Sequence, residues 1–296
     1  MVRGMKDLPF DVLCDIVARC AGGNIYKLAV LRAVNRTFKA SVAVVGSSLD
    51  VANMRYHYDT GVSYPSGGDT VVKGVLEGCS KLIGLLLVSR VDYCELGFRK
   101  LLSCMPDTLC ILDMPSCHMS YEVLLEIGAL PHLQALGLSN GYIHRTCSPW
   151  KGFPQLKLLR VDWMRSVCAE ALEPLRGQLL YLSCHSCQYI DDTLRDGLDS
   201  CVALDLGRNM ISDNGLQSLL DGGAPNLKTL LLSAKSGKSW EDGTWTIAMV
   251  EEMQDEGIEI IQRARYWTNK DAVEECLQDY FQDSPEVLKY AAKYII

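Results

Sequence analysis

A short apolar pattern recurs along this chain at nearly constant spacing. In each copy an apolar residue is followed three and five positions later by two more, and the clearest copy is Cys201, Leu204 and Leu206, closed by Asn209. Seven copies begin at residues 82, 109, 133, 156, 179, 201 and 227, with steps of 27, 24, 23, 23, 22 and 26 residues. A unit of this size cannot bury its own apolar side chains, so neighbouring copies must stack into one continuous core.

The spacing is that of a leucine-rich repeat, whose period is roughly 20–29 residues. Each copy predicts a short strand followed by a helical segment, such as residues 121–127 after the copy that begins at 109. Parallel strands inside and helices outside make an α/β leucine-rich-repeat solenoid. In the clearest copy we expect Asn209 to bond to neighbouring backbone and Gly215 to relieve crowding at the start of a helix.

The chain divides into four regions around this array. Residues 1–45 form a helical segment with apolar residues at helical spacing. Residues 46–70 are polar and rich in Gly, Ser and Tyr, which is typical of a linker but also of a degenerate first repeat. The repeat array covers residues 71–240. Residues 241–296 predict an acidic helical cap that hides the last apolar face of the solenoid.

Three elements are predicted inside the C-terminal cap. Residues 246–256 have the pattern of a helix that ends at Gly257, and residues 258–261 that of a final strand. Ser284 and Pro285 then combine an N-cap with a first-turn proline, so they predict the start of a last helix. The apolar end of that helix predicts docking on the body of the protein.

The net charge of −7 is unevenly placed, because residues 241–296 hold 13 acidic against five basic side chains. A neutral body with an acidic end is a poor partner for phosphate backbones, so we expect neither nucleic acid nor a membrane surface as a ligand. The acidic end itself predicts either a solvated helical surface or a site for a basic partner. The longest strongly apolar stretch, residues 82–88, is too short to span a bilayer.

The cysteines bear on the compartment and on metal binding. The chain has 13 cysteines, and its N-terminus has neither an apolar signal core nor an Arg-rich leader. We therefore expect a cytoplasmic or nuclear protein with reduced thiols and no disulfide framework. Cys184 and Cys187 have the spacing of half a zinc site, but no second pair of this kind exists, and both fall on core positions of the repeat. We predict core packing for both, with no metal and no cofactor.

No catalytic constellation stands out in the sequence. It contains no phosphate loop, no paired-glycine fingerprint after a strand and no nucleophile elbow. A protease-like pairing of Cys and His stays open, because 13 cysteines and five histidines make chance proximity easy. We predict no catalytic residues and a function other than that of an enzyme.

The strands themselves predict a binding surface. Side chains alternate along a strand, so residues between the core positions point to the concave face. The copies that begin at 156 and 179 place Arg160, Asp162, Tyr181 and His185 side by side, with Trp163 at the edge. Tyr, Trp and Arg are the types that anchor protein interfaces. The alternative is a solvated face without a partner. The predicted partner-binding residues are Asp113, Arg160, Asp162, Trp163, Tyr181, His185 and Asp205.

Residues 8–20 and 28–42 resemble an F-box, the helical module that docks on the Skp-type adaptor of a cullin ubiquitin ligase. Asp11 and Cys20 depart from the commoner Glu and Leu of that module. The resemblance implies that the apolar positions and the proline contact the adaptor. The matching residues are Leu8, Pro9, Leu13, Ile16, Leu28, Leu31, Val34, Asn35, Arg36 and Phe38. Asn35 and Arg36 match the motif without an assigned contact.

An F-box followed by leucine-rich repeats is similar to the F-box/leucine-rich-repeat family of substrate receptors. The resemblance implies that the repeat face holds an unidentified target protein while the adaptor and cullin hold it near a ubiquitin-loaded enzyme, with no covalent chemistry in this chain. Two alternatives stay open. In the first, the helices of residues 1–45 only cap the N-terminal end of the repeat array. In the second, the chain is a scaffold or assembly subunit with no ubiquitin link.

Overall fold

The computed structural model describes most of the repeat array and parts of both ends. The described residues are 10–21, 51–55, 82–88, 99, 102–103, 105, 107–116, 118–144, 150–195, 197–233, 244–263 and 270–294. The predicted second helix of the F-box-like segment, within residues 22–50, lies outside these ranges.

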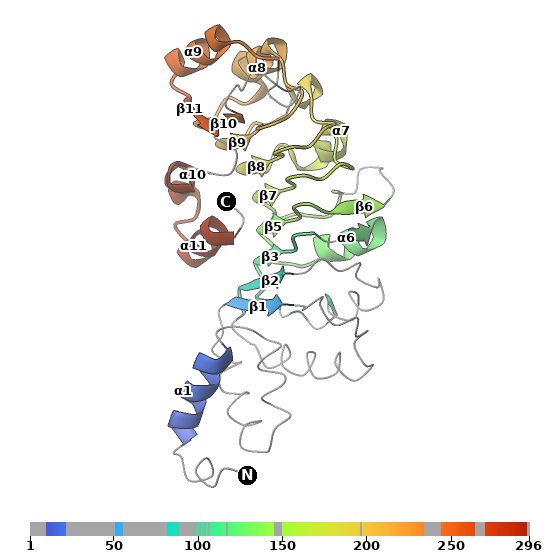
Figure 1. The fold of residues 1–296 in the computed structure, drawn as a ribbon, viewed down its shortest axis with the longest axis vertical. Helices are drawn as coiled ribbons and strands as arrows, with labels where there is room; N and C mark the ends of the chain where they lie inside the picture. The colour runs from blue at the N-terminus through green and yellow to red at the C-terminus, as the bar shows by residue number, and fades with distance from the viewer. Residues whose placement is uncertain are drawn as a thin grey trace.

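One parallel sheet runs the length of the described chain (Figure 1). It has nine strands in chain order, and equivalent repeat positions pair directly, as Leu85 with Leu112 and Leu112 with Leu136. The strands are β1 (Val51–Arg55), β2 (Gly84–Val88), β3 (Ile111–Asp113), β5 (Ala135–Gly137), β7 (Leu158–Arg160), β8 (Tyr181–Ser183), β9 (Ala203–Asp205), β10 (Thr229–Ser233) and β11 (Glu259–Arg263). All seven strands that the repeat predicted are present, so the solenoid is confirmed.

The two remaining strands of this sheet lie outside the seven copies. Strand β1 pairs with β2 in parallel, so residues 46–70 contribute one strand to the array. Strand β11 pairs with β10 and confirms the final strand predicted at residues 258–261.

Short helices form an outer layer on one face of the sheet. They are α6 (Tyr121–Gly128), α7 (Ala169–Leu172), α8 (Asp213–Ser218), a π-helical turn (Leu219–Gly223) and α9 (Ile247–Asp255). Helices α6 and α8 confirm the helices predicted after the copies that begin at 109 and 201, and α9 confirms the helix predicted at residues 246–256. Side-chain oxygens of Ser120, Ser212 and Thr246 cap α6, α8 and α9. A second, two-stranded parallel sheet, β4 (His118–Ser120) and β6 (Tyr142–His144), lies on the flank.

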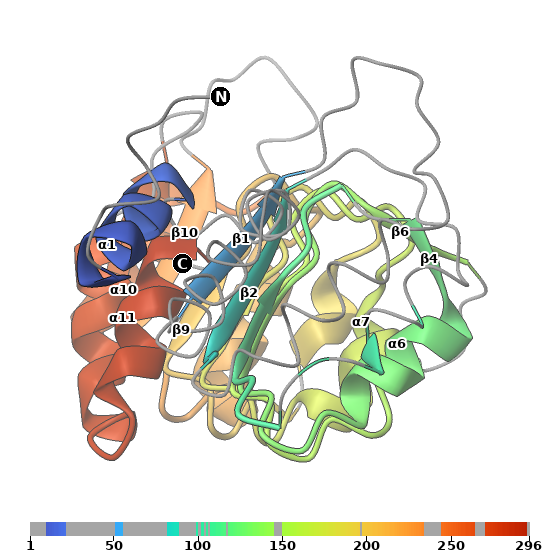
Figure 2. The ribbon, with the colours of Figure 1, turned by 90° about the horizontal axis from the view of Figure 1, so that it is seen from below.

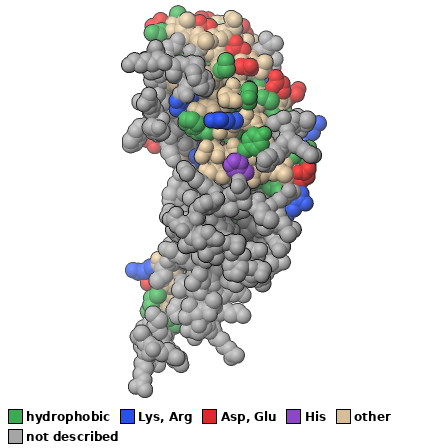
Figure 3. Space-filling view, turned by 45° about the vertical axis from the view of Figure 1, so that its right-hand side comes forward, with side chains coloured by type: hydrophobic (Ala, Val, Ile, Leu, Met, Phe, Trp, Pro, Cys, Tyr) green, Lys and Arg blue, Asp and Glu red, His purple; other side chains and the backbone are tan. Residues whose placement is uncertain are grey.

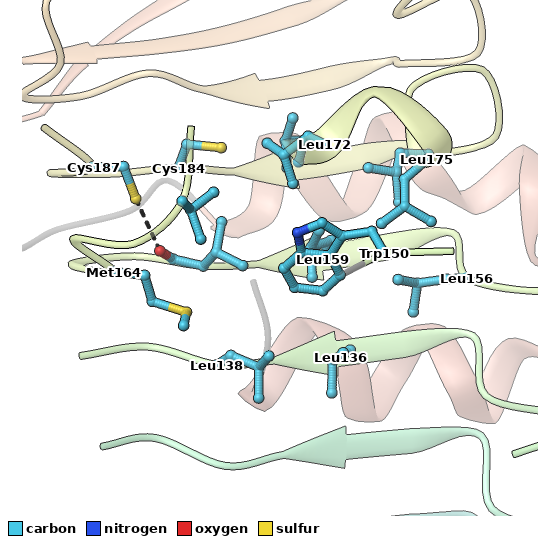
Figure 4. Close-up of a cluster of buried hydrophobic side chains, with 14 of the residues drawn as sticks. Leu136, Leu138, Trp150, Leu156, Leu159, Met164, Leu172, Leu175, Cys184 and Cys187 are labelled. Carbon is cyan, nitrogen blue, oxygen red and sulfur yellow. Dashed lines mark hydrogen bonds between the residues drawn. The ribbon is translucent and has the colours of Figure 1, made fainter. Parts of the chain in front are cut away.

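The main core fills the space between the sheet and the outer layer. The central leucine of each copy, such as Leu136 and Leu159, is fully buried there, together with Trp150 (Figure 4). Cys184 and Cys187 occupy the predicted core positions, and the Cys187 thiol lies 3.0 Å from the Val161 carbonyl oxygen.

The predicted roles of Asn209 and Gly215 are confirmed. The side-chain oxygen of Asn209 accepts from the Cys187 amide, and its nitrogen donates to the Cys184 carbonyl oxygen, both at 2.9 Å. A Cβ at Gly215 would lie 2.3 Å from Asp192 Oδ1, so the start of α8 has no room for a side chain.

Two C-terminal helices cover the inner face of the sheet, which is the face opposite α6 and α7 (Figure 2). Helix α10 (Lys270–Leu277) lies against β9 and β10, and α11 (Pro285–Tyr294) against β2, β3 and β5. Leu277 and Phe281 belong to a second buried cluster with strand residues such as Leu158 and Tyr181. The start of α11 confirms the helix predicted at Ser284 and Pro285.

The placement of α10 and α11 corrects the expected role of the C-terminal region. We expected it to close the end of the solenoid, but these two helices turn back along the inner face. The reason lies in the strands, whose inward residues Ile111, Leu158 and Leu231 are apolar and become buried when the helices cover them.

Candidate protein-interaction surface

Six polar side chains gather at the carboxyl ends of β3, β7, β8 and β9. Arg160 Nη2 donates to Asp113 Oδ1 at 3.1 Å. The Ser183 hydroxyl donates to Asp162, and its oxygen also lies 3.3 Å from Asp205 Oδ2. His185 Nδ1 lies 3.8 Å from Asp205 Oδ1. We call this set the polar cluster: Asp113, Arg160, Asp162, Ser183, His185 and Asp205.

Most of the polar cluster is buried within the protein. Asp205 is fully buried, Asp113 and His185 are each 6% exposed, and the Arg160 side chain is 20% exposed. Burial raises the pKa of Asp113 to about 6, although Arg160 acts in the opposite direction. Burial and the nearby Asp205 carboxylate raise the pKa of Asp162. The cluster therefore joins neighbouring coils from within and offers little surface to a partner.

The structure corrects the predicted partner-binding set. Tyr181 is 1% exposed and lies in the second buried cluster with residues of α10 and α11, so no partner reaches it in this fold. Asp113, His185 and Asp205 are buried in the polar cluster. Arg160 and Asp162 are half-buried, and Trp163 alone of the seven is exposed. The strand residues among them point to the inner face, as predicted. The sequence did not predict that α10 and α11 cover that face.

The coils of β3, β5, β7, β8 and β9 each turn a corner just after the strand through one residue in the left-handed backbone region. These corner residues are Ser116, Asn140, Trp163, Ser186 and Arg208, with φ between 55° and 62°. The amides of Asn140 and Trp163 donate to carbonyl oxygens of the next coil, Asp162 O at 2.7 Å and His185 O at 2.8 Å. We call these five residues the corner row.

Trp163 is the unusual member of the corner row. Asparagine tolerates the left-handed region, whereas a bulky side chain is rare there and costs roughly 1–2 kcal/mol. Its ring is 45% exposed, with the Arg208 guanidinium 5.1 Å from its centroid and the His185 ring 5.9 Å away. A strained backbone that presents an exposed indole between two nitrogen-rich side chains is typical of a binding residue.

Exposed hydrophobic side chains continue from Trp163 along the same flank. Tyr142, Trp163, Tyr189 and Met210 are 39%, 45%, 57% and 57% exposed, and they lie on four consecutive coils, those of β5, β7, β8 and β9. Backbone bridges from Cys168 to Tyr189 and from Asp191 to Met210 join the coils there. The view in Figure 3 shows hydrophobic side chains beside Lys or Arg and His on one face. We call these four residues the flank row.

Three members of the flank row were missed from the sequence. Tyr142, Tyr189 and Met210 each follow a corner residue by two or three positions, where the repeat pattern assigns no apolar role. An aromatic or Met at this offset in several consecutive copies is the signal that could have found them. Exposed apolar side chains on four consecutive coils mark an interaction site more often than scattered residues do.

A cleft of about 420 Å³ opens at one end of the flank row. Its walls come from Trp163 and Arg165 of one coil, residues 140–142 of the next, and Ser116 and His118 of a third. Arg165 and His118 are exposed. None of the described residues that line it is a carboxylate.

The predicted adaptor-binding residues are described only in part. Leu8, Pro9, Leu28, Leu31, Val34 and Phe38 lie outside the described residues. Helix α1 (Phe10–Ala21) contains the other two. Ile16 is half-buried, but Leu13 is 3% exposed, and Val17 on the same helix belongs to the main core with Leu82. Leu13 is therefore not on a free surface, which corrects its predicted docking role.

The described residues offer neither a metal site nor a reactive thiol at Cys187. Within the described ranges, no three His, Cys, Asp or Glu side chains are grouped so that they could hold a metal ion. Burial raises the pKa of Cys187 to about 12, so its thiol is protonated at neutral pH. None of the described helices combines the length and apolar character that crossing a membrane requires.

Comparison with known proteins places the fold. No protein-family model matches the chain, and no curated protein matches its sequence. Internalin InlF of Listeria monocytogenes is similar in structure, with a TM-score of 0.50 and 15% identity over 77% of this chain and 64% of the internalin. Internalin C2 of the same species gives a TM-score of 0.46 and 19% identity, over 80% of this chain and 96% of the internalin.

A third similar structure is TLR13 in its complex with ssRNA13, with a TM-score of 0.51 and 17% identity over 76% of this chain. This chain spans 64% of internalin InlF and 34% of TLR13, less than two thirds of either. At these identities the likeness concerns the fold, and it agrees with the repeat spacing and the parallel sheet. The fold of this chain is therefore that of an α/β leucine-rich-repeat solenoid.

Proposed function

We propose that this chain is a non-catalytic protein-binding receptor that holds a partner protein on its flank row. The observation that carries the proposal is Trp163, an exposed indole on a strained corner beside Arg208 and His185. Trp, Tyr and Arg supply most of the binding energy in protein interfaces. Tyr142 and Tyr189 extend the same surface over neighbouring coils.

The rigidity of this surface supports the proposal. Backbone hydrogen bonds join four of the five corner residues, Ser116, Asn140, Trp163 and Ser186, to the next coil, as between Ser186 N and Gly207 O at 2.8 Å. A surface that is already ordered loses little conformational entropy when a partner binds. The inner face of the solenoid is partly covered by α10 and α11, whereas the flank row holds four of the seven exposed large hydrophobic side chains within the described residues.

The first experiment locates the partner on the surface. A photo-crosslinking amino acid is placed at Tyr189 or Met210, with Ile247 on α9 as the control because it is 66% exposed but belongs to another surface. Cross-linking in the native cell, read by mass spectrometry, should give the same partner at the two flank positions and not at the control. Equal cross-linking at all three positions would contradict the proposed surface.

A substitution then measures the contribution of Trp163. Asn accepts the left-handed backbone, so Trp163→Asn removes the indole without straining the corner. We expect the affinity for the cross-linked partner to fall about tenfold or more, because truncation of a central interface residue often costs about 2 kcal/mol. Ile247→Asn should leave the affinity unchanged.

We further propose that residues 1–45 attach this receptor to a Skp-type adaptor and cullin, so that the bound partner becomes a ubiquitination target. The resemblance at Leu8, Pro9 and Phe38 supports this step, and α1 begins directly after Pro9. The burial of Leu13 argues against a contact through that residue. The 13 cysteines of the chain favour a cytoplasmic or nuclear site for this activity.

The adaptor step has its own test. Purified adaptor should co-elute with the chain, and replacing Leu8 and Pro9 by Asp should abolish the co-elution. Arg19→Gln is the control, because its exposed ion pair with Asp15 contributes little to stability. Co-elution that survives the Leu8 and Pro9 change rules out the assigned docking face.

The alternative is a scaffold or assembly subunit without a ubiquitin link. It predicts constant stoichiometry with neighbouring subunits and no adaptor in a pulldown. The flank-row experiments support protein binding in both cases, and the adaptor experiment separates them.

A further inference from the structure

The cleft beside Trp163 has a fixed floor. Ser116 and Asn140 lie side by side on the corner row, where Asn140 Nδ2 donates to Ser116 Oγ at 3.2 Å. Strands β4 and β6 pair directly behind them, as between His118 and Tyr142. Hydrogen bonds of the backbone and of side chains therefore fix the coils of Ser116 and Asn140 relative to each other. A volume of about 420 Å³ accommodates a few side chains of an extended segment, not a folded domain.

The walls of the cleft are aromatic on two sides. Tyr142 and Trp163 are both exposed and both line it. Arg208 and His185 approach Trp163 from the coils of β9 and β8, whereas the cleft lies toward the coils of β5 and β3. An apolar or aromatic side chain between Tyr142 and Trp163 would gain the area and ring contacts that such walls provide.

The described lining of the cleft carries positive charge. Arg165 is the one permanently charged side chain among the described residues that line it. The nearest carboxylate in sequence, Asp162, is turned into the protein, where it accepts from the Ser183 hydroxyl and from the His185 amide at 3.1 Å. Helix α10, which holds three acidic side chains against one lysine, lies with α11 on the opposite side of the sheet from β4 and β6 (Figure 2).

From this arrangement we infer the chemistry of the partner, an inference that rests on the proposed function. The cleft receives an extended acidic segment of the partner protein, with an apolar side chain between Tyr142 and Trp163 and an Asp or Glu carboxylate at Arg165. A guanidinium binds a carboxylate through two parallel hydrogen bonds, which fixes the register of the segment. A nucleic acid fits less well, because each nucleotide brings a phosphate and one arginine neutralises few of them.

Peptide selection tests this inference without knowledge of the natural partner. The full chain is immobilised and a random peptide library displayed on phage is selected on it. We expect enrichment of peptides in which an apolar or aromatic residue stands near Asp or Glu. The matched pair of variants is Arg165→Glu, which reverses the charge in the cleft, and Lys151→Glu, which makes the same change at an exposed residue outside it.

The charge reversal gives a directional result. Selected acidic peptides should bind Arg165→Glu about tenfold or more weakly, because a hydrogen bond to a charged group is lost and repulsion replaces it. Reselection on Arg165→Glu should yield basic peptides. Lys151→Glu should keep both the affinity and the peptide preference of the wild type. Circular dichroism confirms that each variant is folded.

Several outcomes would overturn the inference. Enrichment of basic or purely apolar peptides on the wild type does so, as does the same affinity in Arg165→Glu and wild type, or no enrichment at all. Tighter binding of a labelled single-stranded RNA homopolymer that depends on Arg165 would assign the cleft to nucleic acid instead. If flank-row cross-linking succeeds while acidic peptides fail, the receptor proposal stands and only the partner chemistry is wrong.

Discussion

Gly207 lies directly against the imidazole of His185, so closely that a Cβ added at Gly207 would stand 2.5 Å from His185 Nδ1. The two residues belong to adjacent coils, β9 and β8. His185 is held there by its amide, which donates to Asp162, and by the nearby Asp205 carboxylate. Glycine is required at this place because of close packing and not because of its backbone conformation.

Gly207→Ala should therefore displace His185 and destabilise the protein. Overpacking of a buried position costs about 1–3 kcal/mol, and that loss is expected in chemical denaturation. The control is Gly177→Ala, where nothing lies within 4 Å of the added Cβ and stability should change little. Equal stability of the two variants would show that His185 moves freely.

Asn209→Ala should destabilise the array by about 2–4 kcal/mol, because it leaves the buried Cys187 amide and Cys184 carbonyl without this partner. Asn214→Ala is the matched control, since Asn214 is exposed on α8. The measurement is the free energy of unfolding from urea titration. A loss below about 0.5 kcal/mol would mean that water replaces both bonds.

The pKa of Asp113 gives a pH dependence with a defined sign. Its pKa is about 6 in the folded protein and near 4 in an unfolded chain, so the folded state holds the proton longer. Stability contributed at this residue is thus present at low pH and is lost as the pH rises from about 4 to 6.

Asp113→Asn removes this titration. Compared with the variant, the wild type should lose up to about 3 kcal/mol of unfolding free energy between roughly pH 4 and pH 7. Urea titrations of both proteins across this range measure the difference. The attraction of Arg160 for the ionised carboxylate is already contained in the pKa of about 6, so parallel curves would contradict a raised pKa.

Thiol reactivity should follow burial. Cys184, Cys187 and Cys201 are fully buried, and burial raises the pKa of Cys187 and of Cys201 to about 12. At pH 8 they should react with an alkylating reagent roughly a thousandfold more slowly than a free cysteine. Half-buried Cys110 and Cys168 serve as internal comparisons. Mass spectrometry of labelled peptides, before and after unfolding, reads the result.

Leu277→Ala tests the packing of α10 on the inner face. Leu277 is fully buried, so the cavity should cost about 2–5 kcal/mol. Glu275→Ala on the exposed side of the same helix should change stability by less than about 0.5 kcal/mol. Similar, small effects in both variants would mean that α10 leaves the sheet readily.

The core positions of the repeat were predictable because apolar residues recur at the same spacing in each coil, and each coil stacks on the next in the same way. Leu112, Leu136 and Leu159 recur at a fixed spacing and all reach the core. Tyr181 obeys the same alternation, yet its burial depends on α10 and α11, which are about 90 residues or more away in sequence. Alternation predicts the side to which a residue points but not what covers that side.

The solenoid, its strands, the Asn209 bonds and the core role of Cys184 and Cys187 could all be predicted from the repeat pattern, because each follows from a period that neighbouring coils share. The covering of the inner face by the C-terminal helices and the exposure of Trp163, Tyr142, Tyr189 and Met210 could not. Exposure depends on which distant segments pack together, and here the chain's own last helices bury the apolar inner face of the sheet.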